Sequence, residues 1–145
     1  MAVEFNPSIF RRYDIRGLAD KELHSPFVEA LGRAFGTVIR RAGGRSAAVG
    51  RDCRDSGPRL VDAFSRGVLS TGIDVLDIGT GPTPLVYFAL HHCAVDGGVA
   101  ITGSHNPPAW NGFKLCHGTQ SIHSEGIQEL RQLIESEDFE TGEGK

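Results

Sequence analysis

A loop of unusual chemical content lies at residues 102–108, where the sequence is Thr-Gly-Ser-His-Asn-Pro-Pro. Ser104 supplies a hydroxyl, His105 an imidazole and Asn106 an amide. The apolar run at 99–101 predicts a short buried strand directly before the loop. A hydroxyl just past the carboxyl end of a strand lies where α/β folds build their sites. We therefore take Ser104 as the candidate reacting group.

The residues around Ser104 are expected to stiffen the loop. Gly103 permits unusual backbone angles and a close approach by a partner. Pro107 and Pro108 fix their own φ angles and restrict the residues before them to extended shapes. Lys114, in a strand expected around 113–115, is close enough along the chain to supply positive charge or a proton. Glycine and proline are also common in ordinary polar turns, so this composition alone does not establish a site.

A serine in this setting could act as a nucleophile or as a phosphoryl carrier. His105 is a chain neighbour and therefore badly placed to act as the base of a hydrolytic triad. The sequence around Ser104 also lacks a Gly-x-Ser-x-Gly elbow. A phosphoserine would add a charge of about −1.5 to −2. It would need positive groups, for which Arg16, His105 and Lys114 are candidates, and preferably a divalent cation.

The segment at 9–17 is expected to be an extended piece that leads into a turn at 14–17. Helices and strands alternate along the rest of the chain. Ser25 and Pro26 are typical of a helix start, and the glycines at 43–44 of a helix end. Apolar spacing predicts three more helices, from residue 57 to about 68, at 85–91 and at 124–136, and strands at 47–49 and 73–78. This order predicts an α/β fold, a three-layer α/β/α sandwich with a mainly parallel, mixed sheet.

Composition indicates one domain with an ordinary core. The chain has 145 residues, 39% hydrophobic content and a net charge of −3, which suggests neither a nucleic-acid nor a membrane partner. No apolar run approaches the roughly 20 residues of a membrane helix, and no secretory leader is recognised. Cys53, Cys93 and Cys116 show no paired spacing, which favours reduced thiols and a cytoplasmic location.

Three segments resemble one known family, the α-D-phosphohexomutases, in the bacterial phosphomannomutase/phosphoglucomutase branch. They are the serine loop at 102–108, Phe-Arg-Arg-Tyr-Asp-Ile-Arg-Gly at 10–17 and Gly-Arg-Asp-Cys-Arg-Asp-Ser-Gly-Pro at 50–58. They occur in the family's order and span almost the whole chain. The resemblance implies the first of four domains, at residues 1–137, with 138–145 starting a linker to a second domain.

The resemblance also implies a mechanism and roles for particular residues. Phosphoserine 104 would give its phosphoryl group to a hexose phosphate, through a bound hexose 1,6-bisphosphate, and so move phosphate between O1 and O6 of glucose or mannose. Ser104 would contribute a phosphate oxygen to Mg²⁺. Lys114 would transfer a proton or stabilise charge, with His105 as an assistant. Tyr13 and Arg16 would line the substrate cleft.

Several residues keep a simpler interpretation beside the functional one. Arg16 could form an ion pair with Asp14, and Asn106 could hydrogen-bond within its own turn rather than contact substrate. The block at 51–54 is expected to brace the serine loop rather than touch sugar. The glycine-rich loop at 79–84 is expected to be a connection rather than a phosphate cradle. Metal binding by the His-His-Cys run at 91–93 is disfavoured, because adjacent helical residues point apart.

One family feature is missing from the sequence, namely an Asp-Gly-Asp type loop that would bind the hard Mg²⁺ ion. We therefore expect the remaining domains to supply the metal ligands, and this chain alone to be inactive as a mutase. The alternatives are a phosphoglucosamine mutase domain, a non-catalytic sugar-phosphate binding module and a serine-dependent hydrolase.

Overall fold

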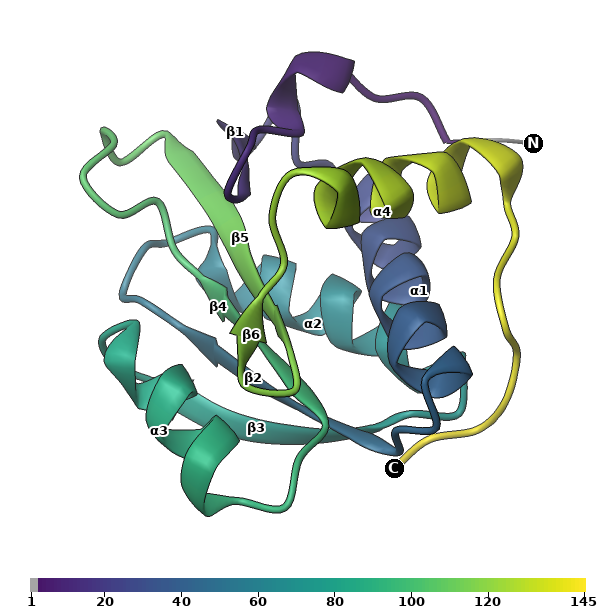
Figure 1. The fold of residues 1–145 in the computed structure, drawn as a ribbon. Helices are drawn as coiled ribbons and strands as arrows, with labels where there is room; N and C mark the ends of the chain where they lie inside the picture. The colour runs from purple at the N-terminus through teal and green to yellow at the C-terminus, as the bar shows by residue number, and fades with distance from the viewer. Residues whose placement is uncertain (1–2) are drawn as a thin grey trace.

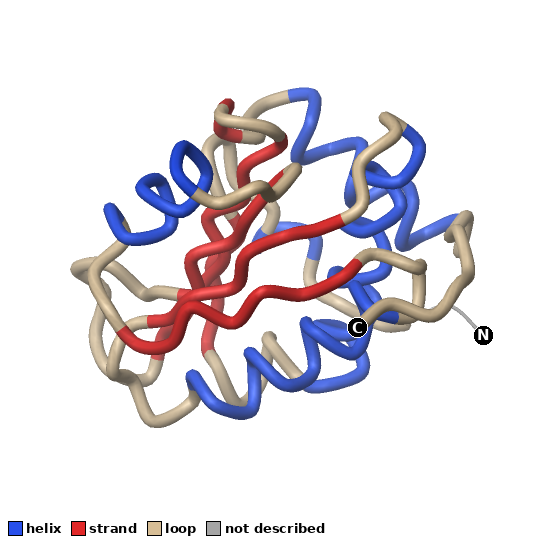
Figure 2. Tube along the Cα trace, turned by 90° about the horizontal axis from the view of Figure 1, so that it is seen from below, coloured by secondary structure: helices blue, strands red, loops and turns tan. Residues whose placement is uncertain are grey.

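The structure, a computed structural model, describes residues 3–145 as one mixed sheet with helices on both faces (Figure 1; Figure 2). The elements in chain order are a 3₁₀ turn at Pro7–Ile9, β1 Ile15–Leu18, α1 Ser25–Arg41, β2 Ser46–Arg51, α2 Gly57–Leu69, β3 Asp74–Thr80, α3 Pro84–His92, β4 Gly97–Ile101, β5 Trp110–His117, β6 Gln120–Ser121 and α4 Glu125–Ser136. The expected α/β/α sandwich is confirmed.

The sheet has the strand order β1-β5-β4-β2-β3, with β6 paired to β5. Strand β2 runs parallel to both β3 and β4, whereas β5 runs antiparallel to β4 and β1. After β2, the chain therefore adds β3 on one side of β2 and then β4 on the other, so the direction of strand addition reverses. The carboxyl ends of β2 and β4 flank this reversal, where open α/β sheets bind their ligands.

Two apolar cores hold the layers together. Helices α1, α2 and α4 cover one face of the sheet, where Phe27, Phe35, Phe64 and Phe113 are fully buried. Helix α3 covers the other face and packs against a smaller cluster that includes Cys116. Burial raises the pKa of the Cys116 thiol, which favours its neutral form.

The first helix begins and ends close to the predicted positions. Its N-cap is His24 rather than the expected Ser25, because His24 Nδ1 accepts a hydrogen bond from the Phe27 N–H at 3.3 Å. Pro26 occupies the first turn, where no N–H is needed. Gly43, at φ +88°, closes the helix as expected, in a conformation that favours glycine.

Segment 14–17 was expected to form a turn, and this expectation is wrong. Residues 15–18 form strand β1, which pairs antiparallel with β5, with Arg16 opposite Gly112. Ile15 is fully buried, so the strand gains core packing as well as backbone hydrogen bonds from this edge position. The bend lies earlier, where the Arg11 N–H donates to the Asp14 carbonyl.

The C-terminal segment 138–145 runs along the domain surface. Arg41 forms ion pairs with Asp138 and Glu140. The hydrogen bond from Arg41, and then its charge, lower the pKa of Asp138. The Glu140 N–H donates to Thr37 Oγ1 at 3.0 Å. Arg40 and Arg41 are both exposed, and both also contact this segment. Whether it begins a linker to another domain stays a prediction.

All three cysteines are free thiols, with Cys53 and Cys93 exposed. Among residues 3–145, the structure shows no helix long and apolar enough to cross a membrane.

Helices α1 and α2 approach each other through two glycines. A Cβ on Gly32 would collide with the carbonyl oxygen of Phe64, and one on Gly67 with the carbonyl oxygen of Glu29. Both obstacles are backbone atoms of the partner helix, which cannot rotate away. The distance between the two helices therefore depends on the absence of side chains at these positions.

Replacing Gly67 with alanine should destabilise the domain despite the higher helix propensity of alanine. We expect the overpacking, about 1–3 kcal/mol, to exceed the propensity gain of about 1 kcal/mol. Urea denaturation would measure this, with Ser65→Ala on the same helix as the control. A Gly67→Ala protein as stable as Ser65→Ala would contradict the close approach.

Candidate active site

Ser104 occupies a strained position at the tip of the loop after β4. Its φ angle is +52°, in the left-handed region that residues other than glycine rarely adopt. Such a conformation costs on the order of 1–3 kcal/mol and persists only where surrounding contacts enforce it. The Ser104 N–H donates to Thr102 Oγ1 at 3.0 Å, which helps to hold it there.

Gly103 was expected to provide the unusual backbone angles, but the strain lies one residue later. Gly103 instead allows close approach, because a Cβ there would collide with the guanidinium of Arg54. Arg54 follows β2, on the neighbouring parallel strand. A glycine beside the serine therefore serves to admit an arginine of the same chain.

Arg54 binds the serine loop through four carbonyl oxygens. Its Nη1 donates to Pro107 at 2.7 Å and Trp110 at 3.0 Å, and its Nη2 donates to Ser104 at 3.0 Å and Asn106 at 2.7 Å. The planar guanidinium can hold several acceptors in fixed directions, which a lysine ammonium cannot. The expectation that 51–54 braces the loop is confirmed.

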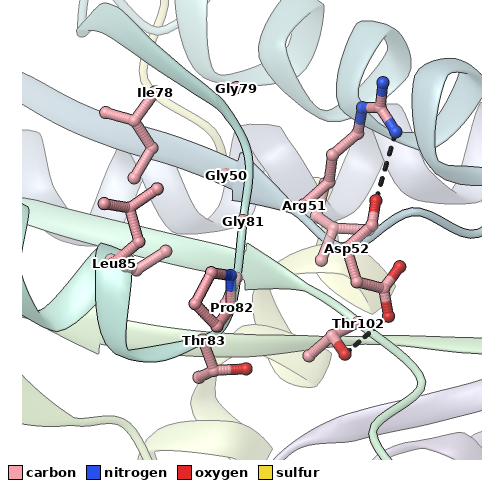
Figure 3. Close-up of a pocket in the computed structure, with 13 residues that line it drawn as sticks. Gly50, Arg51, Asp52, Ile78, Gly79, Gly81, Pro82, Thr83, Leu85 and Thr102 are labelled. Carbon is pink, nitrogen blue, oxygen red and sulfur yellow. Dashed lines mark hydrogen bonds between the residues drawn. The ribbon is translucent and has the colours of Figure 1, made fainter.

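Asp52 joins the ends of β2 and β4. Its carboxylate accepts hydrogen bonds from Thr102 Oγ1 at 2.7 Å, the Gly103 N–H at 3.3 Å and Arg54 Nε at 3.2 Å. Figure 3 shows the Asp52–Thr102 bond between the two strand ends. Asp52 thus orients Arg54 and fixes the base of the loop that Arg54 binds.

The small pocket in Figure 3 lies beside this pair, and residues of the β3–α3 loop line part of it. Its remaining wall is largely apolar, with Ile78, Leu85 and Val86. The Gly81 N–H donates to the Arg51 carbonyl at 2.9 Å, so it is not directed at an external anion. These features favour a connection over a phosphate cradle for residues 79–84.

Arg16 connects the N-terminal motif to the serine loop. Its Nε donates to Asp14 at 2.6 Å, and its Nη1 donates to Asn106 Oδ1 at 2.8 Å. The ion pair with Asp14 is therefore present, while a second nitrogen of the same guanidinium reaches the loop. The Asn106 side chain bonds to this distant residue, so the expectation of a local turn bond is wrong.

Five of the six predicted site residues line two hollows, and His105 lines neither of them. Ser104 and Asn106 line one of them with residues 52–55 and Pro108. Tyr13, Arg16 and Lys114 line the other, together with Tyr87 of α3. The hydrogen bond from Arg16 to Asn106 joins these two hollows, and Ser104 and Lys114 line different ones.

His105 and Tyr13 are exposed, and Ser104 and Lys114 are half-buried. Among the hydrogen bonds of the described residues, none joins Ser104 to His105, as expected for chain neighbours. Tyr87 was not predicted as a site residue. In the sequence, Tyr87 is only an aromatic residue on the outer face of a short helix. Such residues are common, so this pattern does not indicate a site.

This α/β/α domain carries a strained, braced serine loop at the reversal point of its sheet. The family described as phosphoglucomutase/phosphomannomutase, alpha/beta/alpha domain I, matches residues 7–141. The chain therefore belongs to the phosphoglucomutase/phosphomannomutase family, where it corresponds to domain I.

Curated relatives share this similarity over most of the chain. A phosphomannomutase/phosphoglucomutase of Pseudomonas aeruginosa is 43% identical over 137 residues, which are 94% of this chain and 30% of the relative. A phosphoglucomutase/phosphomannomutase of Thermococcus kodakarensis is 42% identical over 90% of this chain and 29% of its own length. This chain spans about 30% of the length of these two relatives.

Solved structures show the same architecture. A phosphoglucomutase/phosphomannomutase family protein from Burkholderia thailandensis superimposes with a TM-score of 0.93 at 42% identity, covering 98% of this chain and 33% of that one. A Thermus thermophilus protein described as a phosphomannomutase gives a TM-score of 0.83 at 28% identity, covering 100% of this chain and 33% of that one.

Replacing Arg54 with alanine should loosen the serine loop while the sheet stays folded. Four carbonyl oxygens would lose their shared donor, and the Asp52 carboxylate would lose a charged partner. We expect amide hydrogen exchange at Asn106 and Trp110 to become roughly tenfold faster or more. Trp110, the only tryptophan of the chain, also reports loop motion by fluorescence anisotropy.

The control is Arg131→Ala, which removes an arginine from the exposed side of α4. It should leave both amides and the anisotropy unchanged. Equal exchange rates in Arg54→Ala and Arg131→Ala would show that Arg54 does not hold the loop.

Proposed function

We propose that Ser104 is the phosphoryl carrier of a phosphohexomutase, of which this chain is the first domain. The observation that carries the proposal is the strained, braced conformation of Ser104 at the reversal point of the sheet. A loop fixed in this way presents one hydroxyl in one direction, as a group that must both accept and donate phosphate requires.

The proposed reaction is a pair of phosphoryl transfers. In the first, the bond between phosphorus and Ser104 Oγ breaks, and a hydroxyl oxygen of a hexose phosphate bonds to phosphorus. The hydroxyl proton passes to a base, and Ser104 Oγ takes up a proton. After the bound hexose 1,6-bisphosphate reorients, the reverse transfer returns its other phosphoryl group to Ser104, and phosphate has moved between O1 and O6.

The remaining site residues would transfer protons, stabilise charge and contact the substrate. Lys114 is proposed to transfer a proton or stabilise charge, and His105 to assist it. Arg16 and Tyr13 are proposed to contact the sugar phosphate, with Arg16 already directed at the serine loop through Asn106. Asn106 is also a proposed substrate contact, although its Oδ1 accepts from Arg16 in this structure.

Mg²⁺ is part of the proposal, with an oxygen of phosphorylated Ser104 as one ligand. Within residues 3–145, the structure shows no group of three or more histidine, cysteine or carboxylate side chains that could hold a metal ion. Asp52, the carboxylate next to the loop, is already bonded to Thr102, Gly103 and Arg54. The other metal ligands would therefore come from outside this part of the chain.

Activity is proposed for the full-length protein in the cytoplasm, with the remaining domains and a hexose phosphate as partners. A phosphoglucosamine mutase is the nearest alternative within the family, and a sugar-phosphate binding module would not need phosphate on Ser104. A serine hydrolase would instead form an acyl-enzyme and react with a fluorophosphonate.

Replacing Ser104 with alanine in the full-length protein should abolish phosphoprotein and turnover together. Intact-mass measurement should show one phosphoryl group on the parent protein and none on the variant. Turnover of glucose 1-phosphate in a coupled assay should fall by roughly 10³-fold or more, as when a catalytic nucleophile is removed.

Ser136→Ala, on the exposed end of α4, is the matched control and should keep both the phosphoryl group and the activity. An active Ser104→Ala protein would remove the mechanism. A full-length protein that never carries phosphate but still binds hexose phosphate would favour the binding module.

The chain of residues 1–145 alone should show no turnover of glucose 1-phosphate above background. Its described residues include no group of three or more histidine, cysteine or carboxylate side chains that could hold a metal ion, and Ser104 and Lys114 lie in separate hollows. A coupled assay on the isolated chain measures this, with the full-length protein as the positive control. Normal turnover by the isolated chain would contradict the proposed need for further domains.

A further inference from the structure

Strand β3 forms one edge of the sheet, and the C-terminal segment reaches that edge. β2 lies on one side of β3. On the other side, the Val75 N–H donates to the carbonyl of Lys145 at 3.0 Å. In Figure 1 the yellow C-terminal segment descends beside α1 and ends near the start of β3.

The direction of this segment is defined by its contacts. Gly142 forms a parallel bridge with Thr71, and three residues further along Lys145 lies beside residues 74–75. The Lys145 N–H donates to the Asp74 side chain rather than to the Val75 carbonyl, so the pattern is not that of an antiparallel pair. The segment therefore runs parallel to β3 and in step with it.

Two glycines bring the segment close to the backbone of the residues just before β3. A Cβ on Gly144 would collide with the carbonyl oxygen of Ile73, and one on Gly142 would lie 2.9 Å from the Cα of Gly72. Glu143, between them, is exposed. The approach is thus as close as that of a neighbouring strand at these two positions.

Ahead of Lys145 lies a groove between α2 and β3, of about 510 Å³. Val61, Ser65 and Leu69 line it from α2, Val75 and Asp77 line it from β3, and Lys145 also lines it. Because successive N–H groups of a strand point to opposite edges, the Asp77 N–H points to the same free edge as that of Val75. Unpaired edges of this kind readily accept a further strand.

We propose that the polypeptide following Lys145 in the full-length protein adds a strand to β3, parallel to it, and fills this groove. The curated relatives have more than twice as much chain outside the matched part as within it, which is ample length for such a segment. Its next N–H groups would donate to the β3 edge, and its carbonyls would accept from Asp77. Alternate side chains would pack against Val61, Leu69 and Val75.

The proposal makes the β3 edge the surface through which the domain is attached to the rest of the protein. It is independent of the proposed phosphoryl transfer, because none of the groove residues belongs to the serine loop. A protein inactive as a mutase could still show the added strand, and an active one could lack it.

Amide hydrogen exchange at Asp77 tests the proposal. In the full-length protein the Asp77 amide should exchange at least tenfold more slowly than in the chain of residues 1–145, because it gains a carbonyl acceptor. The Asp74 amide donates to Arg45 within the domain and should exchange at the same rate in both. Equal rates for Asp77 in the two proteins would overturn the proposal.

A pair of substitutions in the full-length protein gives a second measurement that does not need the shorter chain. Gly144→Val should displace the segment and restore fast exchange at Asp77, whereas Glu143→Val should keep exchange slow. Slow exchange in both variants would overturn the proposal. So would protection of Asp77 in the short chain that grows with protein concentration, since a second copy would then be the occupant.

Discussion

The structure depends on one set of contacts, the hydrogen bonds from the Arg54 guanidinium to the backbone carbonyls of the serine loop. Arg54 comes from the end of β2, and the loop comes from the end of β4. Asp52 fixes the position of Arg54 and also binds Thr102 and Gly103. A loop rich in glycine and proline would otherwise sample many conformations. Here its carbonyl groups converge on one cation, and Ser104 is held in a conformation that it would not adopt alone.

Most of the fold could be predicted from local sequence signals. The helix starting at Ser25-Pro26 and ending before Gly43, and the short apolar strands, follow from periodicity and capping residues. The strand at 15–18 could not be predicted in this way, since its pairing with β5 joins residues almost a hundred positions apart. The behaviour of segment 138–145 was missed for the same reason, because its bonds are to α1, α2 and β3 rather than to neighbours in sequence.

In the candidate site too, some features could be predicted from the sequence and others depend on tertiary contacts. Ser104 and the bracing role of residues 51–54 were predictable from motifs, and the structure adds which atoms make the contact. The φ angle of Ser104 was not predictable, because the sequence suggested that Gly103 would carry the strain. The bond between Arg16 and Asn106 was also unforeseen, since each residue had a plausible partner nearby. Long side chains choose among acceptors according to tertiary position, which spacing along the chain does not specify.

The convergence of carbonyls on Arg54 has an entropic consequence. The serine loop becomes ordered when the domain folds. A molecule that binds at Ser104 therefore does not bear the entropy cost of ordering this loop. In the proposed reaction, large motions would then belong to the substrate or to the other proposed domains rather than to this loop. Residues 102–108 would stay in place during those motions.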